Sequence, residues 1–288
     1  MMRVPGLKLL LSAFLCLLCV AAAAQAQDFS KAQRAEIRRF AANNSLFVLY
    51  HEIGHLLFHQ LELPILGREE DAADNVATWI LLNKPTKEAD LALAQAAEGW
   101  ALSGIAYDSG GEESDYAANH SLDKQRAYQI VCLMVGMDEK TFRPIANEYR
   151  ITTDRQDSCN WDYGTINRSL LGLLGRDNKS GGGTEVTVTY HGAGRELQYA
   201  ADAFKSSGVF DQVADELRNN YRLEKPVAFN ARRCGEANAF YDPETVEVIF
   251  CYELMQDYMD LYSGSLAAKP ATKTKTGKTK PPKPSAEH

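Results

Sequence analysis

A histidine, a glutamate and a second histidine stand within five residues of one another near the start of the chain. They are His51, Glu52 and His55, in the pattern His-Glu-x-x-His. Positions four apart lie on one face of an α-helix, so both imidazoles can bind one metal ion. Glu52 can then accept a proton from a water molecule that the metal acidifies. These residue types at this spacing predict a hydrolytic zinc site.

The alternative interpretation is a buried amphipathic helix whose histidines are ordinary core residues. The segments that flank the motif, residues 47–49 and 56–58, are strongly apolar, which predicts a helix buried on most sides. Two histidines and a glutamate in such a place are costly unless something pairs with them. A bound metal ion would be that partner, so we favour the metal site.

More acidic residues stand at the start of the next predicted helix. A proline and a glycine end the first helix, and an acidic first turn then suits the positive N-terminal end of a second one. Glu70 and Asp74 are four apart and share a face. We predict Glu70 as the third zinc ligand and Asp74 as the carboxylate that holds the free nitrogen of a ligand histidine. Glu69 or Asp71 as the ligand is the alternative, although neither has a carboxylate four residues later.

The combined pattern resembles a known group of enzymes. His51-Glu52-x-x-His55 followed by Glu70-x-x-x-Asp74 is similar to the gluzincin branch of zinc metallopeptidases. The longer string, residues 46–77, resembles an uncharacterised family of predicted metallopeptidases. This resemblance implies an α+β, zincin-like fold, with a mainly helical metal-binding half and a small C-terminal sheet with helices. It also implies one zinc ion and a peptide or protein substrate.

A third histidine is a candidate for the catalytic machinery. His120 lies just before a helix that Ser121 or Asp123 can start. Zinc peptidases often place a histidine or tyrosine beside the metal, where it donates a hydrogen bond to the developing oxyanion. We predict that role for His120, with Asp123 as its orienting partner. A helix-cap or surface residue is the equal alternative. Arg126 is interpreted as a structural ion pair rather than a substrate clamp.

Substrate contacts are predicted near the C-terminal end. Asn238-Ala239-Phe240-Tyr241, followed by an apolar strand, resembles the edge at which neprilysin-like gluzincins pair with an extended peptide. This resemblance implies substrate binding by Asn238 and Ala239. In those enzymes the edge precedes the His-Glu-x-x-His helix, whereas here it follows it. The alternative is a plain hairpin that turns at Asp242-Pro243.

The elements that position these residues fall into successive segments. We expect a helical zinc-binding half at 27–177, a Gly-rich linker at 178–184, and an α/β half at 185–265. The first helix should run from a Ser30-x-x-Gln33 capping box to about Ala42, with a break at Asn43–Ser45. Cys159 and Trp161 should lie in a loop, and two helices should meet near residues 206–208. Three alanines, Ala72, Ala73 and Ala77, should let the two motif helices approach closely.

The N-terminus and the cysteines predict export. Two basic residues, an apolar run of 9–20 and Ala24-Gln25-Ala26 read as a signal peptide, residues 1–26, with an uncleaved anchor as the alternative. Four cysteines remain after cleavage, an even number that favours disulfides in a secreted or periplasmic protein. We favour Cys132–Cys159 and Cys234–Cys251, although the sequence leaves the other two connectivities open.

Charge excludes some partners. The chain has 31 basic and 38 acidic residues, and six lysines fall in the last segment, so the folded body is strongly acidic. Nucleic acid is therefore excluded as a partner, and no stable membrane span is expected after signal cleavage. Residues 266–288 should be a disordered Lys/Pro-rich tail that can touch anionic envelope surfaces. The rival functions are a non-catalytic zinc-binding envelope or sensor protein, a structural protein with a fortuitous motif, and a zinc amidase acting on cell-wall peptides.

Overall fold

The computed structural model describes residues 29–174 and 182–268. The predicted signal peptide, the first part of the Gly-rich linker and almost all of the predicted tail lie outside the described residues. The chain divides into two compact units, residues 1–34 and 35–288. In the first unit the Ser30 side chain accepts from the backbone of Gln33 at 3.2 Å, and the Gln33 side chain accepts from Ser30 at 3.0 Å. The predicted capping box is therefore confirmed.

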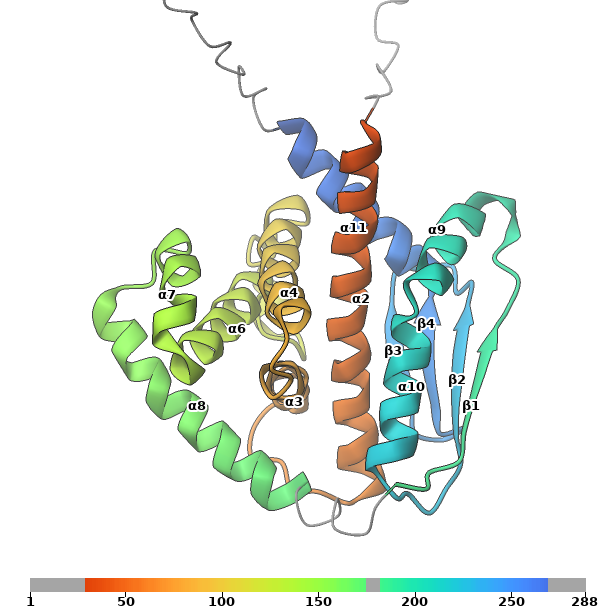
Figure 1. Ribbon diagram of the computed structural model, residues 1–288, viewed down its shortest axis with the longest axis horizontal. Helices are drawn as coiled ribbons and strands as arrows, with labels where there is room; N and C mark the ends of the chain where they lie inside the picture. Colours follow the sequence, from red (N-terminus) through yellow and green to blue (C-terminus); the bar gives the residue numbers. More distant parts are fainter. Residues whose placement is uncertain (1–28, 175–181, 269–288) are drawn as a thin grey trace, which may run out of the picture. The chain divides into compact units, whose positions relative to one another are not determined.

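The part of the chain before the linker is helical (Figure 1). Its elements are α2 (Lys31–Gln60), α3 (Glu69–Leu82), α4 (Lys87–Ala106), α5 (Glu113–Tyr116), α6 (Asp123–Met137), α7 (Glu139–Glu148) and α8 (Thr153–Leu174). Thr86 caps α4, because its side chain accepts a hydrogen bond from the backbone of Ala89 at 3.1 Å. α6 packs against both α4 and α8, and α3 contacts all three of these helices.

The part after the linker alternates strands and helices. It consists of β1 (Val186–Tyr190), α9 (Gly194–Ser207), α10 (Val209–Asn220), β2 (Val227–Arg232), β3 (Ala239–Asp242), β4 (Glu247–Cys251) and α11 (Tyr252–Ala268). The four strands of these described residues form one sheet in the order β1-β2-β4-β3. β1, β2 and β4 are parallel, and the edge strand β3 is antiparallel to β4. The predicted α+β class is confirmed.

Aromatic side chains hold the helices on one face of the sheet. Phe204 of α9 stacks on Phe250 of β4 with ring centroids 3.9 Å apart, and Phe210 of α10 lies 5.3 Å from Phe229 of β2. The register pairs Ala239 of β3 with Phe250, so both point to this face. The interruption between α9 and α10 falls at Gly208, where φ is 73°, a left-handed value that glycine tolerates. The predicted break near residues 206–208 is confirmed.

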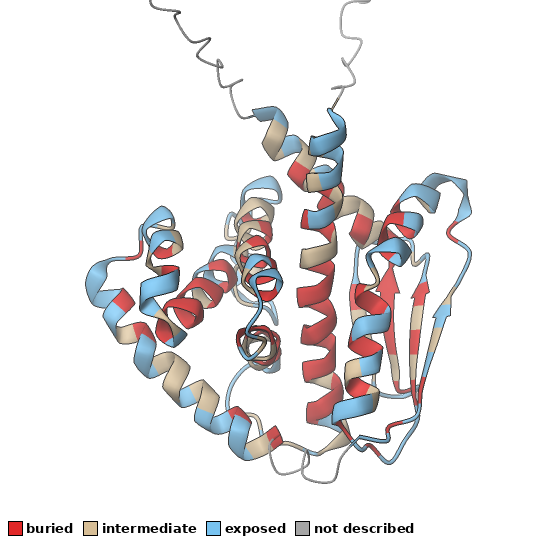
Figure 2. Cartoon of the chain, viewed as in Figure 1, coloured by how far each residue is buried: buried red, intermediate tan, exposed pale blue. Residues whose placement is uncertain are grey.

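The predicted break in the first helix is wrong. α2 is continuous through Asn44 and Ser45, and Figure 2 shows that most of its length is buried. The side-chain amide of Asn44 donates to the carbonyl of Phe40 at 2.9 Å and to that of Gln95, in α4, at 3.1 Å. Ser45 donates to the carbonyl of Ala41 at 2.8 Å. Because both polar side chains find partners, they do not interrupt the helix.

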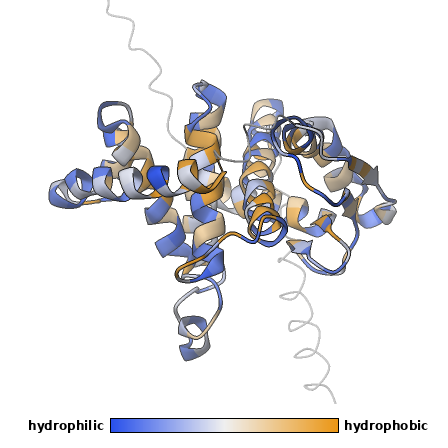
Figure 3. Cartoon of the chain, turned by 90° about the horizontal axis from the view of Figure 1, so that it is seen from below, coloured by the Kyte–Doolittle hydropathy of each residue, from blue (hydrophilic) through white to orange (hydrophobic). Residues whose placement is uncertain are grey.

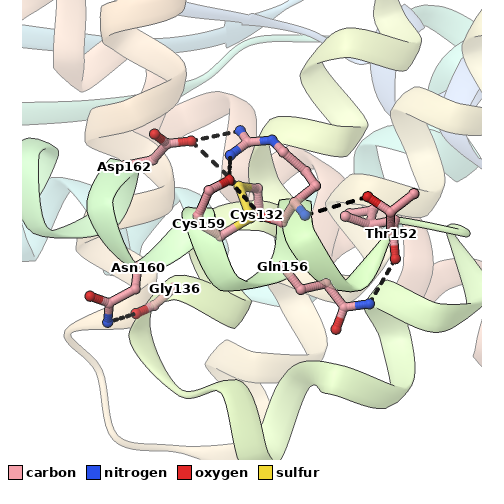
Figure 4. Close-up of a disulfide and its surroundings, with 10 residues drawn as sticks. Cys132, Gly136, Thr152, Gln156, Cys159, Asn160 and Asp162 are labelled. Carbon is pink, nitrogen blue, oxygen red and sulfur yellow. Dashed lines mark hydrogen bonds and ion pairs between the residues drawn. A yellow bond between two sulfur atoms is a disulfide. The ribbon is translucent and has the colours of Figure 1, made fainter.

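The predicted loop around Cys159 and Trp161 is also wrong, since both residues lie within α8. The segment is poor in apolar residues, but it packs on α6 and is joined to that helix by the Cys132–Cys159 disulfide (Figure 4). A Cβ atom at Gly136 would lie 2.2 Å from the carbonyl oxygen of Cys159, so only glycine permits this approach. Tertiary packing therefore sets the conformation where periodicity is weak.

The second predicted disulfide, Cys234–Cys251, is also present. It closes the open end of the β3–β4 hairpin, whose other end turns at Asp242 and Pro243. Disulfides of this kind fit an exported protein.

The helices carry hydrophobic and hydrophilic positions side by side (Figure 3). Among the described residues, no helix has the length and apolar character needed to cross a membrane.

Candidate metal centre

Helix α2 brings the two motif histidines together. The Nε2 atoms of His51 and His55 lie 3.0 Å apart, one helical turn from each other. His51 is buried and His55 is partly exposed. Glu52 is also buried, and it lines the same cleft as the two rings. Both imidazoles therefore present a nitrogen to one point.

Helix α3 adds a carboxylate to this point. Glu70 Oε2 lies 3.1 Å from His51 Nε2 and 3.3 Å from His55 Nε2. One ligand atom from each of the three residues lies within 4.8 Å of the other two, which is a group that could hold a metal ion. Two imidazole nitrogens and one carboxylate oxygen are a donor set that catalytic zinc sites use, with the fourth position open.

A close approach of α2 and α3 makes this convergence possible. A Cβ atom at Gly54 would lie 3.0 Å from Cα of Ala73, so the helices touch at two small residues. Gly54 directly precedes His55, and Ala73 directly precedes Asp74. Of the three predicted alanines, Ala73 is the one that contacts Gly54.

Each motif histidine also contacts a carboxylate through its other nitrogen. Asp74 Oδ1 lies 2.8 Å from His51 Nδ1, and Glu69 Oε1 lies 2.8 Å from His55 Nδ1. Such outer carboxylates fix the tautomer and the orientation of a ligand imidazole. Glu69, the alternative ligand in the sequence analysis, thus contacts the far side of His55. The only sequence signal for this contact was the position of Glu69 next to Glu70.

Asp74 is itself held by a buried arginine. Arg126 of α6 donates from Nε to Asp74 Oδ2 at 2.7 Å and from Nη2 to Oδ1 at 2.8 Å. Its guanidinium lies 3.5 Å from the centroid of the Trp100 ring. The predicted structural ion pair of Arg126 is therefore found, and its partner is Asp74.

These contacts set the charge of the centre. Burial alone would lower the pKa of His51, but the hydrogen bonds that its ring donates to Asp74 and Glu70 raise it to about 9. Burial works against the ionised form of Glu70, but His120, His51 and His55 hold its pKa well below the ordinary range. Burial raises the pKa of Glu52, whereas both histidines lower it. A buried carboxyl with a raised pKa is suited to accept and return a proton.

His120 lies beside the same carboxylate. Its Nε2 atom is 2.9 Å from Glu70 Oε2, and its ring is 6.2 Å from that of His51. The N-cap of α6 is Leu122, so His120 does not cap this helix. Asp123, the predicted orienting partner, accepts a hydrogen bond from Ser103 at 2.6 Å. The fold thus brings a half-exposed imidazole to the open side of the centre.

A cleft of about 1010 Å³ runs from the centre to the edge strand. Asn238, Ala239 and Tyr241 line it together with the motif residues. The contacts of Tyr241 were not predicted from the sequence: its hydroxyl is 2.9 Å from His59 Nδ1 and accepts from Gln60 at 3.0 Å. Its backbone also hydrogen-bonds Glu52. Only its place after Asn-Ala-Phe could have pointed to this contact.

The site combines two histidines and the carboxylate of Glu70 with two outer carboxylates, Asp74 and Glu69. Metal-dependent hydrolases use sites of this class. A family model, DUF4344, described as "Putative metallopeptidase", matches residues 13–174 and 190–280. The chain belongs to this family. A metallopeptidase family implies a metal cofactor and peptide substrates. No curated protein and no solved structure gives a match to the chain.

Proposed function

We propose that this protein is an exported zinc metallopeptidase. The observation that carries the proposal is the convergence of His51, His55 and Glu70 within 4.8 Å, beside a buried Glu52. Zinc is the metal that best suits two imidazoles, one carboxylate and an open position. When bound, it supplies a Lewis acid that acidifies water and polarises a carbonyl group.

The residues of the chain perform the remaining steps. Glu52 accepts the proton of the attacking water and returns it to the leaving amine, a role that its raised pKa supports. His120 donates a hydrogen bond to the oxygen that gains negative charge, because its ring stands next to Glu70. Asp74 and Glu69 keep both histidine rings in the orientation that metal binding needs.

The edge strand β3 offers a place for a peptide substrate. In an antiparallel pair, the backbone groups of successive residues point alternately toward and away from the partner strand. Because the carbonyl of Asn238 accepts from the amide of Cys251 at 3.0 Å, the backbone groups of Ala239 point away from β4. An extended peptide can add to such an edge. Asn238 and Ala239 are accordingly our candidate substrate contacts.

Export rests on two features. The sequence of residues 1–26 has the form of a secretory signal. The two disulfides suit a secreted or periplasmic protein, where thiols become oxidised. Edman sequencing of the mature protein from a native host tests this part, and the expected first residue is Gln27.

The Glu52→Gln variant tests the catalytic proposal. Because the amide cannot accept a proton, we expect unchanged zinc content and a loss of peptide hydrolysis of about 10²-fold or more. Hydrolysis is measured by mass spectrometry on a peptide library. Glu88→Gln, on the exposed first turn of α4, is the matched control and should keep full activity. Full activity of Glu52→Gln would contradict the proposal, and zinc without turnover in the wild type would favour a non-catalytic zinc protein.

A further inference from the structure

A second, smaller cavity of about 220 Å³ lies next to the candidate metal centre. It shares five lining residues with the large cleft: His51, Glu52, His120, Asn238 and Ala239. Three of these shared residues, His51, Glu52 and His120, belong to the candidate metal centre. The two hollows therefore meet at the centre.

Away from the centre, the two hollows extend to different parts of the fold. The large cleft continues to Ile65, in the connection between α2 and α3, and to Pro243, at the end of β3. The second cavity continues between α4 and α11, where Trp100, Leu254 and Leu261 line it. Those three side chains are only partly buried, so this cavity reaches the surface. A bound chain thus has the large cleft to lie in, and the second cavity adds a separate hollow beside the centre.

The charged side chains that line the large cleft already have partners. Arg68 donates to the carbonyl of His120 at 3.3 Å, and Glu69 contacts His55 at 2.8 Å. Glu70 contacts three imidazoles, and Glu52 accepts a hydrogen bond from the backbone of Tyr241. A free peptide terminus is normally recognised by an opposite charge held ready for it. In this cleft, each of these charged side chains instead has at least one partner within the protein.

The same holds for the second cavity. Arg126 gives two donors to Asp74 and its face to Trp100. Asp257 accepts a hydrogen bond from the hydroxyl of Tyr107. The remaining walls are mainly apolar or aromatic, and the volume lies below the roughly 300–1,000 Å³ of sites that take whole small molecules. Such a space is suited to one apolar side chain.

From these observations we infer that the enzyme cleaves internal bonds of extended peptides and does not trim chain ends. The second cavity takes an apolar side chain that flanks the cleaved bond, and Leu254 limits its size. This inference rests on the proposed peptidase function and specifies its substrate class. The enzyme then needs neither a free amino terminus nor a free carboxylate on the substrate.

A matched pair of peptides tests the inference with the full mature protein. A cleavable ten-residue sequence from the library is prepared once with free ends and once with acetyl and amide ends. We expect both to be cut at the same internal bond, with kcat/KM values within about threefold, because no terminal charge is recognised. A loss of about 100-fold on blocking either end, or stepwise removal of terminal residues, would overturn the inference. If the library contains no peptide that the protein cuts, it is the proposed function that fails.

Variants of the second cavity test the side-chain pocket. Leu254→Trp fills the cavity, and we expect kcat/KM to fall about tenfold or more for peptides with Leu or Phe beside the cut, but less for Ala. Leu254→Ala enlarges the cavity and should shift the preference toward larger side chains. Leu171→Trp, on the exposed face of α8, is the matched control. Equal profiles for both Leu254 variants and the control, at unchanged zinc content, would contradict the pocket assignment.

Discussion

Asp74 contacts His51 through a carboxylate oxygen 2.8 Å from the Nδ1 atom of the ring. This contact turns the other ring nitrogen, Nε2, toward Glu70 Oε2 at 3.1 Å. The carboxylate is fixed in turn by two donors of Arg126. The predictions below follow from this chain of contacts and from the helix packing that permits it.

The Asp74→Asn variant should bind zinc about 10–100-fold more weakly, because an amide orients and polarises the imidazole less well. Competition with a chromophoric chelator measures the affinity. Asp71→Asn, one turn earlier on the same helix, is the control and should keep the wild-type affinity. An unchanged zinc affinity in Asp74→Asn would show that this carboxylate does not support metal binding.

Arg126→Met should lower the free energy of unfolding by about 3–5 kcal/mol, because the buried carboxylate of Asp74 loses two charged donors and keeps only its contact with His51. Urea denaturation measures the loss. Arg155→Met breaks the half-exposed pair with Asp162 and should cost less than about 1 kcal/mol. Equal losses in the two variants would show that the buried ion pair contributes no more to the free energy of unfolding than the half-exposed pair does.

Gly54→Ala tests the contact between the two motif helices. The added methyl group lies 3.0 Å from Cα of Ala73, so we expect α3 to shift slightly away from α2 and Glu70 to shift with it. We expect a loss of about 1–3 kcal/mol in stability, together with weaker zinc binding. Gly172→Ala in α8 meets nothing within 4 Å and should stabilise the chain by about 1 kcal/mol. Wild-type zinc affinity in Gly54→Ala would argue against this role of the glycine.

The binding of zinc should depend on pH. Because the pKa of His51 is raised to about 9, a zinc ion must displace a proton at neutral pH. The dissociation constant should therefore fall by about tenfold for each pH unit between pH 6 and 8. Chelator titrations across this range measure it. A dissociation constant that does not change with pH would contradict the shift.

The stability of chelator-treated protein should fall as the pH rises, whereas the affinity for zinc increases. A pKa raised from 6.5 to about 9 stabilises the fold fully below pH 6.5, and this contribution is lost as the pH rises through 9. The melting temperature of wild type relative to His51→Gln should therefore decrease between pH 6 and 9.5. A melting-temperature difference that stays constant over that range would show that His51 does not contribute to the pH dependence of stability.

Much of the centre could be predicted because it depends on local periodicity. His51 and His55 share a helix face whatever the rest of the fold does, and Glu70 and Asp74 share one on the next helix. The even number of cysteines favoured disulfides, and the pairing that puts one bridge in each half is the one found, although the sequence left the other two connectivities open. The α+β class was predicted from the family resemblance.

Other contacts could not be predicted, because they join residues far apart in sequence. The contacts of Tyr241 with His59 and of Arg126 with Trp100 depend on how separate elements pack. The continuity of α2 through Asn44 depends on a carbonyl in α4. α8 has too few apolar residues for its periodicity to be read, and it is supported by its packing on α6.

Elemental analysis of the mature protein, purified without chelators or added metal, tests the central claim most directly. We expect about one zinc per chain in the wild type and in Glu52→Gln, and less than about a tenth of that in His51→Ala and Glu70→Ala. Far-UV circular dichroism should be retained in each variant, so that loss of metal is separated from loss of fold. A wild-type chain without any divalent metal, or full zinc content in both ligand variants, would contradict the account.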